Sequence, residues 1–518
     1  MKISEKKAIT LVALVITIIV LLILAGITIS LTMGQNGIIT RAQEAGKNYT
    51  EAQNAELAGL NQFDQELADI LSNKVDGSWS SKNKVNRPKL ANTGLIPVTI
   101  GSDGTTSNIE VELENWYSYD GTTNQWANAQ TKDGSMFVWI PRFAYKINRD
   151  DKSIDVVFLK NTTNLYEEAG VEKEATSNGY VVHPAFQDGT KNGYANGEWD
   201  KEISGFWMAK FEAAYDGEAG NADSATDSNV AYSVIFGSNG SENIEIEDYY
   251  YGKRAVGTKI KYPVYKANRP SMNYISIGDS FALARDMTSE ANPYGLKNID
   301  SHMTKNSEWG AVTYLTHSKY GRNGAEVTLN NITLNEVDHV RAVTGFGASS
   351  VNEPSQRTTW DKIASGTQPG SWITSQGQLA STTGNMYGIY DLSGGLWERT
   401  AGFISVTTGN YAAYGGALKG ESDKYRSKYA GTSGLDKDNY SVSPNTDRIG
   451  EAIWETSTIG SGSSSWNGDY SCFTFSGSPF FMRGGRWADE SNDGLFAFNR
   501  TVGSSIYDHG FRAVLVCE

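Results

Sequence analysis

An almost unbroken apolar run, Ala8–Leu31, fixes where the rest of this chain can lie. As a helix rising about 1.5 Å per residue it spans ~36 Å, enough to cross the hydrocarbon core of a bilayer. Lys6 and Lys7 precede it, and basic residues remain on the cytoplasmic side. We therefore predict a single-pass anchor over 1–33 in the cell membrane, with the C-terminal domain extracellular. A cleaved secretory signal is the competing interpretation, but no clear small-x-small cleavage site follows the run.

The next stretch, Ile38–Leu71, has the composition of a second helix. It is rich in Ala, Glu, Gln and Leu, it contains no proline, and its only glycines are Gly46 and Gly59. These residue types favour an amphipathic helix. We predict a stalk over residues 34–75 that continues the anchor and lifts the downstream domain off the membrane.

Composition narrows the class of partner. The chain has 518 residues, 39% of them hydrophobic, which is ample for a buried core. Its net charge of −14 comes without a large basic patch, which argues against nucleic acid as a partner because phosphate binding needs clustered Lys and Arg. Cys472 and Cys517 either pair outside the cell or stay free, and no Cys/His spacing indicates zinc.

From Trp79 onward, short alternating apolar runs separated by Gly, Asn, Asp and Ser replace the helical pattern. We expect residues 76–133 to be a β-rich extension of the main domain or a small β-rich unit of their own. The overall expectation is an α+β fold with long irregular connections. The individual predictions are strands at Ser135–Ile147, Gly205–Ala213 and Phe511–Val516, helices at Phe281–Met287 and Ser307–Tyr314, and polar loops at Asp216–Asn229 and Thr456–Ser465.

Several sequence blocks follow one another in a set order. They are FVWIP at 137–141, GFWMAKFE at 205–212, MTKNSEWGA at 303–311, GNMYGIYDLSGGLWE at 384–398, RGGRW at 483–487 and GFR at 510–512. In this order they resemble the formylglycine-generating-enzyme superfamily, whose fold is a variant of the C-type lectin fold. The resemblance covers residues 134–518 and implies a C-type-lectin-like domain with much irregular structure.

The residues in these blocks suit a scaffold. Paired glycines at 394–395 and 484–485 permit backbone angles that other residues resist. We expect charged side chains to form buried hydrogen-bonded pairs, and the candidates are Glu308, Glu398, Arg483 and Arg512. The tryptophans each bring a large apolar surface for burial, and they are Trp139, Trp207, Trp309, Trp397 and Trp487.

The same resemblance locates where catalysis would occur. The namesake enzymes oxidise a cysteine of a target peptide with a copper-binding cysteine pair, placed between the Arg-Gly-Gly block and the final Gly-Phe-Arg block. Here that interval, Ala488–His509, contains no cysteine, and the five histidines of the chain form no metal-binding motif. We therefore expect no enzyme and no cofactor. A structural calcium ion stays open, because Asp436–Asn439 hints at a cation loop without the full calcium spacing.

The interval Ala488–His509 also resembles the variable segment of proteins diversified by retroelements, which share the lectin-like fold. In those systems adenines of a template are mutated, so asparagine codons are the main targets, and only Glu490 falls outside the reachable residues. Within the interval, 495–498 looks like fixed core. The resemblance implies ligand contacts from residue types that adapt well to partners. The ligand-binding candidates are Ala488, Asp489, Asn492, Asp493, Arg500, Thr501, Val502, Ser504, Ile506, Tyr507, Asp508 and His509.

The N-terminus resembles that of type IV pilins over roughly 70 residues, through the Lys6-Lys7 pair and the start of the apolar run. Pilins usually carry Gly before the cleavage point and Glu five residues into the mature chain, where this chain has Ala8 and Ala13. The leading hypothesis is a surface-displayed protein that binds an extracellular protein or glycan through a diversified segment. The alternatives are a minor pilin or adhesin subunit in a pilus-like assembly, and an oxidase of the formylglycine-generating type.

Overall fold

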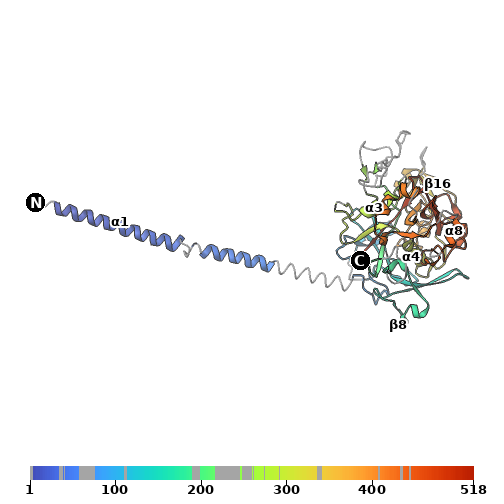
Figure 1. Ribbon diagram of the computed structural model, residues 1–518, viewed down its shortest axis with the longest axis horizontal. Coiled ribbons are helices and arrows are strands. Elements are labelled where there is room, and N and C mark those ends of the chain that lie inside the picture. Colours follow the sequence, from blue (N-terminus) through green and yellow to red (C-terminus); the bar gives the residue numbers. More distant parts are fainter. Residues whose placement is uncertain are drawn as a thin grey trace. The chain divides into compact units, whose positions relative to one another are not determined.

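The chain forms two compact units, Met1–Lys74 and Val75–Glu518 (Figure 1). The computed structural model describes residues 4–33, 39, 41–57, 76–109, 114–189, 199–215, 246–247, 259–260, 262–273, 275–290, 292–334, 341–405, 409–431, 436–442 and 445–517. The predicted loop at Asp216–Asn229 lies outside these residues.

The first unit is helical wherever it is described. Helix α1 spans Ser4–Met33, and its stretch Val12–Ile29 has a mean hydropathy of 3.1 with no residue buried. The hydroxyl of Thr17 donates to a main-chain carbonyl one turn earlier, so this polar group is satisfied inside the helix. The helix is therefore long and apolar enough to cross a membrane. Residues 41–57 are also helical, and 58–75 of the predicted stalk lie outside the described residues.

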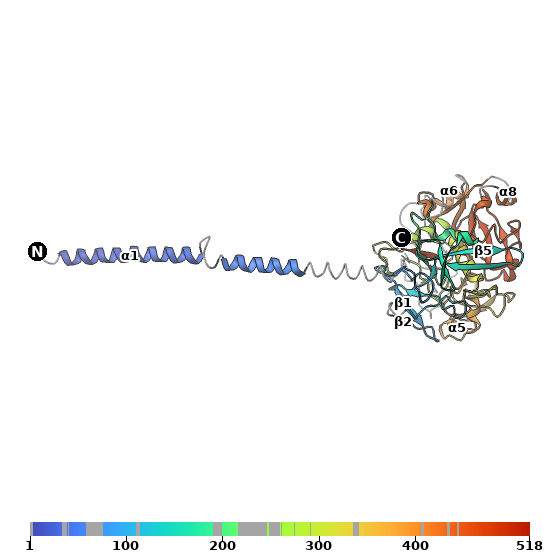
Figure 2. The same ribbon diagram turned by 90° about the horizontal axis from the view of Figure 1, so that it is seen from below.

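The second unit is built on a seven-stranded antiparallel sheet in the order β13-β24-β10-β4-β3-β1-β2. Figure 2 labels β1 and β2 at one end of this order. In the centre of the sheet Trp207 pairs with Trp139, and both are fully buried. Strands β1–β3 come from the predicted extension 76–133, so that segment is part of the main sheet. The strands are β1 Ile96–Ile100, β2 Thr106–Asn108, β3 Asn128–Gln130, β4 Met136–Pro141, β10 Gly205–Ala209, β13 Asp300–Met303 and β24 Ala513–Val516.

A second sheet follows the order β18-β17-β21-β22-β20-β19, with β23 paired to β17. Strand β22 is antiparallel to β21, and β23 is parallel to β17. This sheet includes β22 and the first residue of β23 from the interval Ala488–His509. Its strands are β17 Trp397–Ile404, β18 Ser427–Tyr429, β19 Ser461–Gly462, β20 Ser471–Cys472, β21 Phe480–Gly484, β22 Gly494–Thr501 and β23 His509–Phe511.

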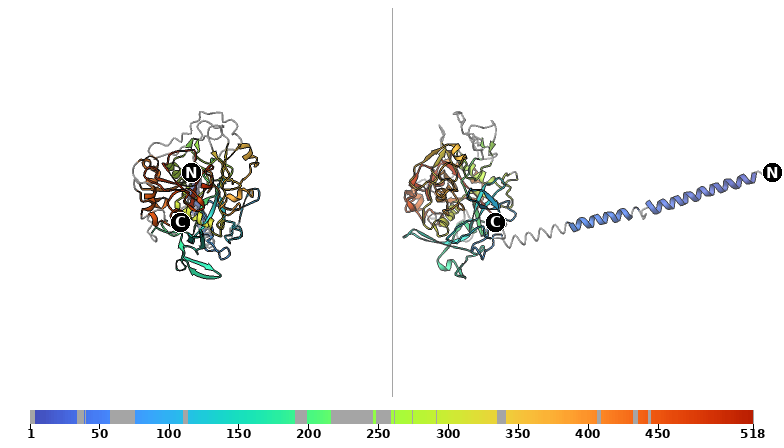
Figure 3. Two further views of the ribbon diagram at one scale, coloured as in Figure 1. Left: turned by 90° about the vertical axis from the view of Figure 1, so that its right-hand side faces the viewer. Right: turned by 180° about the vertical axis from the view of Figure 1, so that it is seen from behind.

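Helices and small sheets complete the unit. The predicted helices are present as α3 (Ile277–Asp286) and α4 (Asn306–His317), and every residue of α4 is buried. A hairpin of β7 and β8 projects from this unit (Figure 3). The remaining strands are β5 Phe143–Asn148, β6 Ser153–Phe158, β7 Leu165–Glu168, β8 Val171–Glu174, β9 Val181–Val182, β11 Ile246–Glu247, β12 Lys259–Ile260, β14 Ile332–Leu334, β15 Arg341–Ala342 and β16 Gln356–Thr358, and the short helices are α5 Trp360–Ala364, α6 Asn410–Tyr414, α7 Gly416–Lys419 and α8 Asp436–Ser441. The unit is thus a mixed α+β structure with many strands and few helices.

Buried charges join the sheets as the sequence suggested, with one exception. The Arg512 guanidinium forms two bonds to Glu398 of β17, at 2.9 and 2.6 Å, at the point where the chain leaves β23 for β24. Glu308 bonds His302 at 2.8 Å and lies 3.4 Å from the Lys305 ammonium. The expectation of a carboxylate partner for Arg483 is wrong for the described residues. Its guanidinium donates to the main-chain carbonyls of Glu451 and Ala452 and to that of Ala497 on β22.

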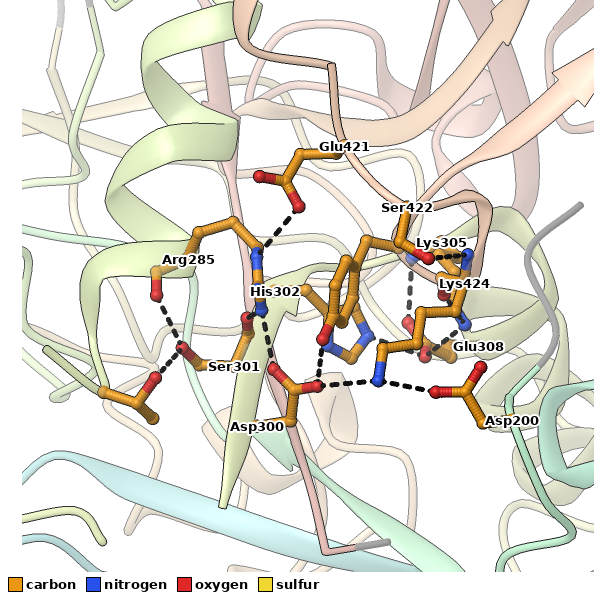
Figure 4. A network of polar contacts seen from close by, with 12 residues as sticks. Asp200, Arg285, Asp300, Ser301, His302, Lys305, Glu308, Glu421, Ser422 and Lys424 are labelled. Atoms are coloured by element: carbon orange, nitrogen blue, oxygen red, sulfur yellow. Dashed lines mark hydrogen bonds and ion pairs between the residues drawn. The ribbon is translucent and has the colours of Figure 1, made fainter. Parts of the chain in front are cut away.

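A polar network ties the edge strand β13 to α3, α4 and the loop before β18 (Figure 4). Asp300 accepts from Arg285 at 2.6 Å and lies 3.6 Å from the Lys424 ammonium, which also bonds Asp200 at 3.1 Å. On the same strand, His302 bonds Glu308. Because β13 flanks the C-terminal strand β24, this network helps to hold the end of the chain in the main sheet.

The predicted scaffold tryptophans are all buried, with exposed fractions between 0% for Trp139 and 5% for Trp487. Both cysteines are free, so of the two alternatives left by the sequence the unpaired state is found. Cys472 is buried and Cys517 is half-buried.

Candidate ligand-binding surface

Strand β22 forms the buried middle of the interval Ala488–His509. Residues Leu495 to Phe498 are at most 5% exposed, as the sequence predicted for fixed core. The Trp309 indole donates to the Leu495 carbonyl at 2.9 Å, and the ring centres of Phe496 and Trp466 lie 5.3 Å apart. The strand is covered on both faces, so it serves as a base for the segments on either side of it.

The two ends of the interval meet at Arg486. Its guanidinium donates to Asp489 at 3.0 Å and to Asp508 at 2.6 Å, and lies 3.3 Å from the Tyr507 hydroxyl. Burial opposes the charge of Arg486, but Asp489 and Asp508 outweigh it and raise its pKa above the ordinary value. The positions after RGGRW and those before the final GFR therefore share one surface.

Aromatic side chains border this contact. The Trp397 indole donates to Asp489 at 2.9 Å, and the rings of Trp487 and Tyr507 lie 6.0 Å apart. Tyr507 is 37% exposed and Ala488 is also exposed. We call this set the Arg486 surface, and it consists of Arg486, Trp487, Ala488, Asp489, Tyr507 and Asp508.

Hydrogen bonds to its main-chain carbonyls hold the loop 502–508 in place. The Asn273 side-chain amide donates to the Tyr507 carbonyl at 2.7 Å, and the Gly503 carbonyl accepts from the Ile277 main-chain amide at 3.0 Å. Arg399, which is fully buried on β17, donates to the Ser504 carbonyl. Within this loop the side chains of the predicted residues at 502, 504 and 506 are half-buried.

Other predicted residues lie away from the Arg486 surface or have partners of their own. The Asn492 side chain accepts from the Ser463 hydroxyl at 2.8 Å, and the Arg500 guanidinium lies 4.5 Å from the Phe475 ring centre. Both Asn492 and Arg500 are half-buried.

The structure buries four of the predicted side chains, Asp493, Thr501, Asp508 and His509. Asp493 accepts from the Arg486 main-chain amide at 3.0 Å, and His509 accepts from Arg399 at 3.1 Å. Burial lowers the pKa of His509 well below its ordinary value, and Arg399 adds to this effect, so the ring is neutral and can accept. Asp508 belongs to the Arg486 surface through its bond to Arg486, and its own side chain is buried.

Arg486, Trp397 and Arg399 are members or supports of the site that sequence reasoning did not identify as such. Arg486 had a usable signal, because it closes the RGGRW block directly before the interval. The sequence around Arg399 carries no such signal, because this side chain bonds mainly to main-chain carbonyls of residues that are distant in the sequence.

Within the described ranges, no group of three or more His, Cys, Asp or Glu side chains is arranged to hold a metal ion. Asp438 of the predicted cation loop is exposed at α8.

Comparison with known proteins gives few matches. No family model matches the chain, and no curated protein matches it. Among solved structures, the chain is similar to Treponema denticola variable protein 1, with 11% sequence identity and a TM-score of 0.20. That match covers 60% of this chain and 95% of the other. A likeness this weak leaves the fold family and the function to be argued from the chain's own residues.

Proposed function

We propose that this protein is a membrane-anchored, surface-displayed binding protein that recognises an extracellular protein or glycan through the Arg486 surface. In this proposal, Val75–Glu518 has the variant of the C-type lectin fold that the ordered sequence blocks suggest. Residues 488–509 are the segment that a retroelement diversifies. One observation carries it, namely that Arg486 brings both ends of this interval together while β22 between them stays in the core.

This arrangement suits recognition for a physical reason. Exposed side chains such as Ala488 and Tyr507 can change with little effect on folding, because surface substitutions usually alter stability by no more than about 0.5 kcal/mol. The main chain beneath them is fixed by β22 and by the bonds to loop 502–508. A partner would therefore meet a rigid surface on which tyrosine supplies a large contact at low entropic cost.

Genomic sequence next to the gene provides the most direct test of diversification. We expect a near-copy of the DNA that encodes about 483–516, differing from the gene only at adenines, and a reverse transcriptase gene close by. Absence of both would contradict diversification and leave only a constant binding surface.

A binding experiment tests the surface itself. Cells displaying the full chain would be tested for attachment to glycan arrays and to a panel of immobilised extracellular proteins. Tyr507→Ala should weaken any attachment by about 30-fold, the effect of losing ~2 kcal/mol at a central aromatic contact. The matched control is Val171→Ala on the β7–β8 hairpin, which is 57% exposed and should leave attachment unchanged. Equal attachment by both variants would contradict the proposal.

A minor pilin or adhesin subunit is the second candidate, favoured by the 30-residue helix α1, which contains Lys6-Lys7 in its first turn and is apolar after them. Restoring the pilin-type glutamate with Ala13→Glu should then increase incorporation into filaments. If the Ala13→Glu variant stays in the membrane and forms no filaments, the result would favour a simple membrane anchor over a pilin subunit.

A further inference from the structure

Two aspartates are buried behind the start of β22. Asp469 is fully buried and Asp493 is 2% exposed. One oxygen of each is satisfied, since Asp469 Oδ2 accepts from the Phe496 amide at 2.9 Å and Asp493 Oδ1 from the Arg486 amide at 3.0 Å. The other oxygens, Asp469 Oδ1 and Asp493 Oδ2, are buried without a hydrogen-bond partner. In the described part of the chain, no Lys, Arg or His side chain forms an ion pair with either carboxylate.

Glycines at the ends of β21 and β22 show how closely these carboxylates are packed. A Cβ added to Gly494 would overlap the Asp469 carboxylate, and one added to Gly485 would overlap that of Asp493. Gly494 directly follows Asp493 and pairs with Gly484 of β21. The two carboxylates therefore lie close to the same short piece of main chain.

Two unpaired carboxylates in such a place are costly. Taking one carboxylate out of water costs several kcal/mol unless a cation or hydrogen bonds compensate. Burial raises the pKa of Asp469 well above its ordinary value, with Glu326 adding repulsion, and burial raises the pKa of Asp493 likewise, with Asp489 adding repulsion. A proton would neutralise each charge but would add a buried O–H donor that itself needs an acceptor.

We propose that Asp469 and Asp493 bind a divalent cation of the calcium type through their unpartnered oxygens. Ca²⁺ takes six to eight oxygen ligands, from carboxylates, main-chain carbonyls and water. No third acidic, Cys or His side chain joins the pair among the described residues, so carbonyls and water supply the remaining positions. The site is independent of the proposed function, because it depends only on these two side chains.

The cation would fix the start of β22 and the turn Glu490–Asn492 before it. Because the folded chain binds it and the unfolded chain does not, Ca²⁺ should stabilise the fold. At a free Ca²⁺ concentration of 100 times the dissociation constant, the unfolding equilibrium constant should fall about 100-fold.

The test uses the full chain in detergent, with Ca²⁺ as the probe. Calorimetric titration should show saturable Ca²⁺ binding to the wild type, and Ca²⁺ should raise its melting temperature relative to the protein in EDTA. Asp469→Asn and Asp493→Asn should each abolish both effects. Without Ca²⁺ they should still fold, since asparagine has the same shape and removes the buried charge, and its amide adds buried N–H donors that keep the gain in stability small. Asp438→Asn is the matched control, because Asp438 is exposed in the predicted cation loop, and it should keep the full response.

A measurement on the wild type alone guards against variants that fail to fold. The calorimetric titration of the wild type and its melting temperatures in Ca²⁺ and in EDTA need no variant. The proposal is overturned if the wild type binds no Ca²⁺, or if Asp438→Asn rather than Asp469→Asn abolishes the binding. If Asp469 and Asp493 instead share a proton, the wild type should bind no Ca²⁺, and the protein should be most stable at acidic pH.

Discussion

Replacing Arg512 with methionine should be among the most destabilising single changes in this protein. The side chain is fully buried where the chain passes from β23 to β24. Besides its two bonds to Glu398, it donates to the carbonyls of Ala209 at 2.7 Å and Tyr390 at 2.8 Å. It therefore connects β17 of the second sheet with β10 of the first.

The magnitude follows from what the substitution leaves behind. Glu398 is 1% exposed and would lose its cation, and breaking a buried ion pair in this way costs about 3–5 kcal/mol. Two buried carbonyls would also lose a donor, at roughly 1 kcal/mol each. Protonation of Glu398 limits the total loss of stability. Burial raises the pKa of Glu398 and Arg512 lowers it, so the carboxyl takes up a proton more readily once Arg512 is gone. We expect a loss of about 3–5 kcal/mol in the free energy of unfolding.

Equilibrium unfolding in urea, followed by tryptophan fluorescence of the full chain in detergent, would measure this loss. Adding Glu398→Gln to Arg512→Met should recover about 1–2 kcal/mol, since it removes the stranded charge. Arg357→Met is the matched control, because Arg357 is exposed on β16 and should matter by less than about 0.5 kcal/mol. A loss below 1 kcal/mol for Arg512→Met, or no recovery in the double variant, would refute the reasoning.

Further predictions concern a glycine and two buried titratable groups. Gly485→Ala should prevent stable folding, measured by circular dichroism, because its φ is +87° and a Cβ would overlap Asp493. Gly170→Ala, at φ +79° with open space around it, should cost only about 1–2 kcal/mol. Burial lowers the pKa of His183 from 6.5 to about 3, so the unfolded chain binds a proton that the native ring rejects. Stability should thus fall as pH drops from 6.5 towards 3, by at most ~1.4 kcal/mol per pH unit, and His183→Gln should flatten this slope in urea titrations at pH 7 and 5. Burial raises the pKa of Glu212 well above 4.5, so the native state holds a proton that the unfolded chain releases. Stability should fall as pH rises above 4.5, and Glu212→Gln should raise the urea midpoint at pH 8 relative to wild type.

The sequence predicted elements wherever a local pattern was strong. The single strand predicted at 135–147 is two strands, β4 and β5, which are separated at Arg142 and end at Asn148, and the strand predicted at 205–213 contains β10. Helix α4 begins at Asn306, one residue before its predicted start, because the Glu308 carboxylate accepts from the Lys305 amide and caps it. Local chemistry of this kind is visible in a sequence even when periodicity is weak.

Pairings between distant segments could not be predicted in the same way. Strand β24 lies between β10 and β13, which are separated from it by some 200 to 300 residues of chain. Arg483 illustrates the same limit, since its acceptors are main-chain carbonyls, and every residue type has one. A charged side chain therefore indicates that a buried partner is needed, but not which one.

For the candidate site, the sequence located the interval but not the direction of its side chains. Leu495 and Phe498 are core as expected. Thr501 and His509 were expected among the ligand contacts and are buried, because β22 is covered on both faces and β23 pairs with β17. In a strand covered on both sides, alternation no longer separates inward from outward residues, so pattern alone gives no guide.

The Arg486 surface suggests why some positions of the interval can vary more than others. Asp489 and Asp508 are tied to Arg486, whose side chain is still 30% exposed. Asp489 is half-buried, so its pair with Arg486 contributes no more than about 1 kcal/mol. Asp508 is 7% exposed, and Asp493 is 2% exposed and fixes the Arg486 amide, so changes at these two positions should cost more. If the interval is diversified, sequences of its variants should therefore differ more at 489 than at 508 and keep Asp or Asn at 493, and unrestricted variation at 493 would contradict this account.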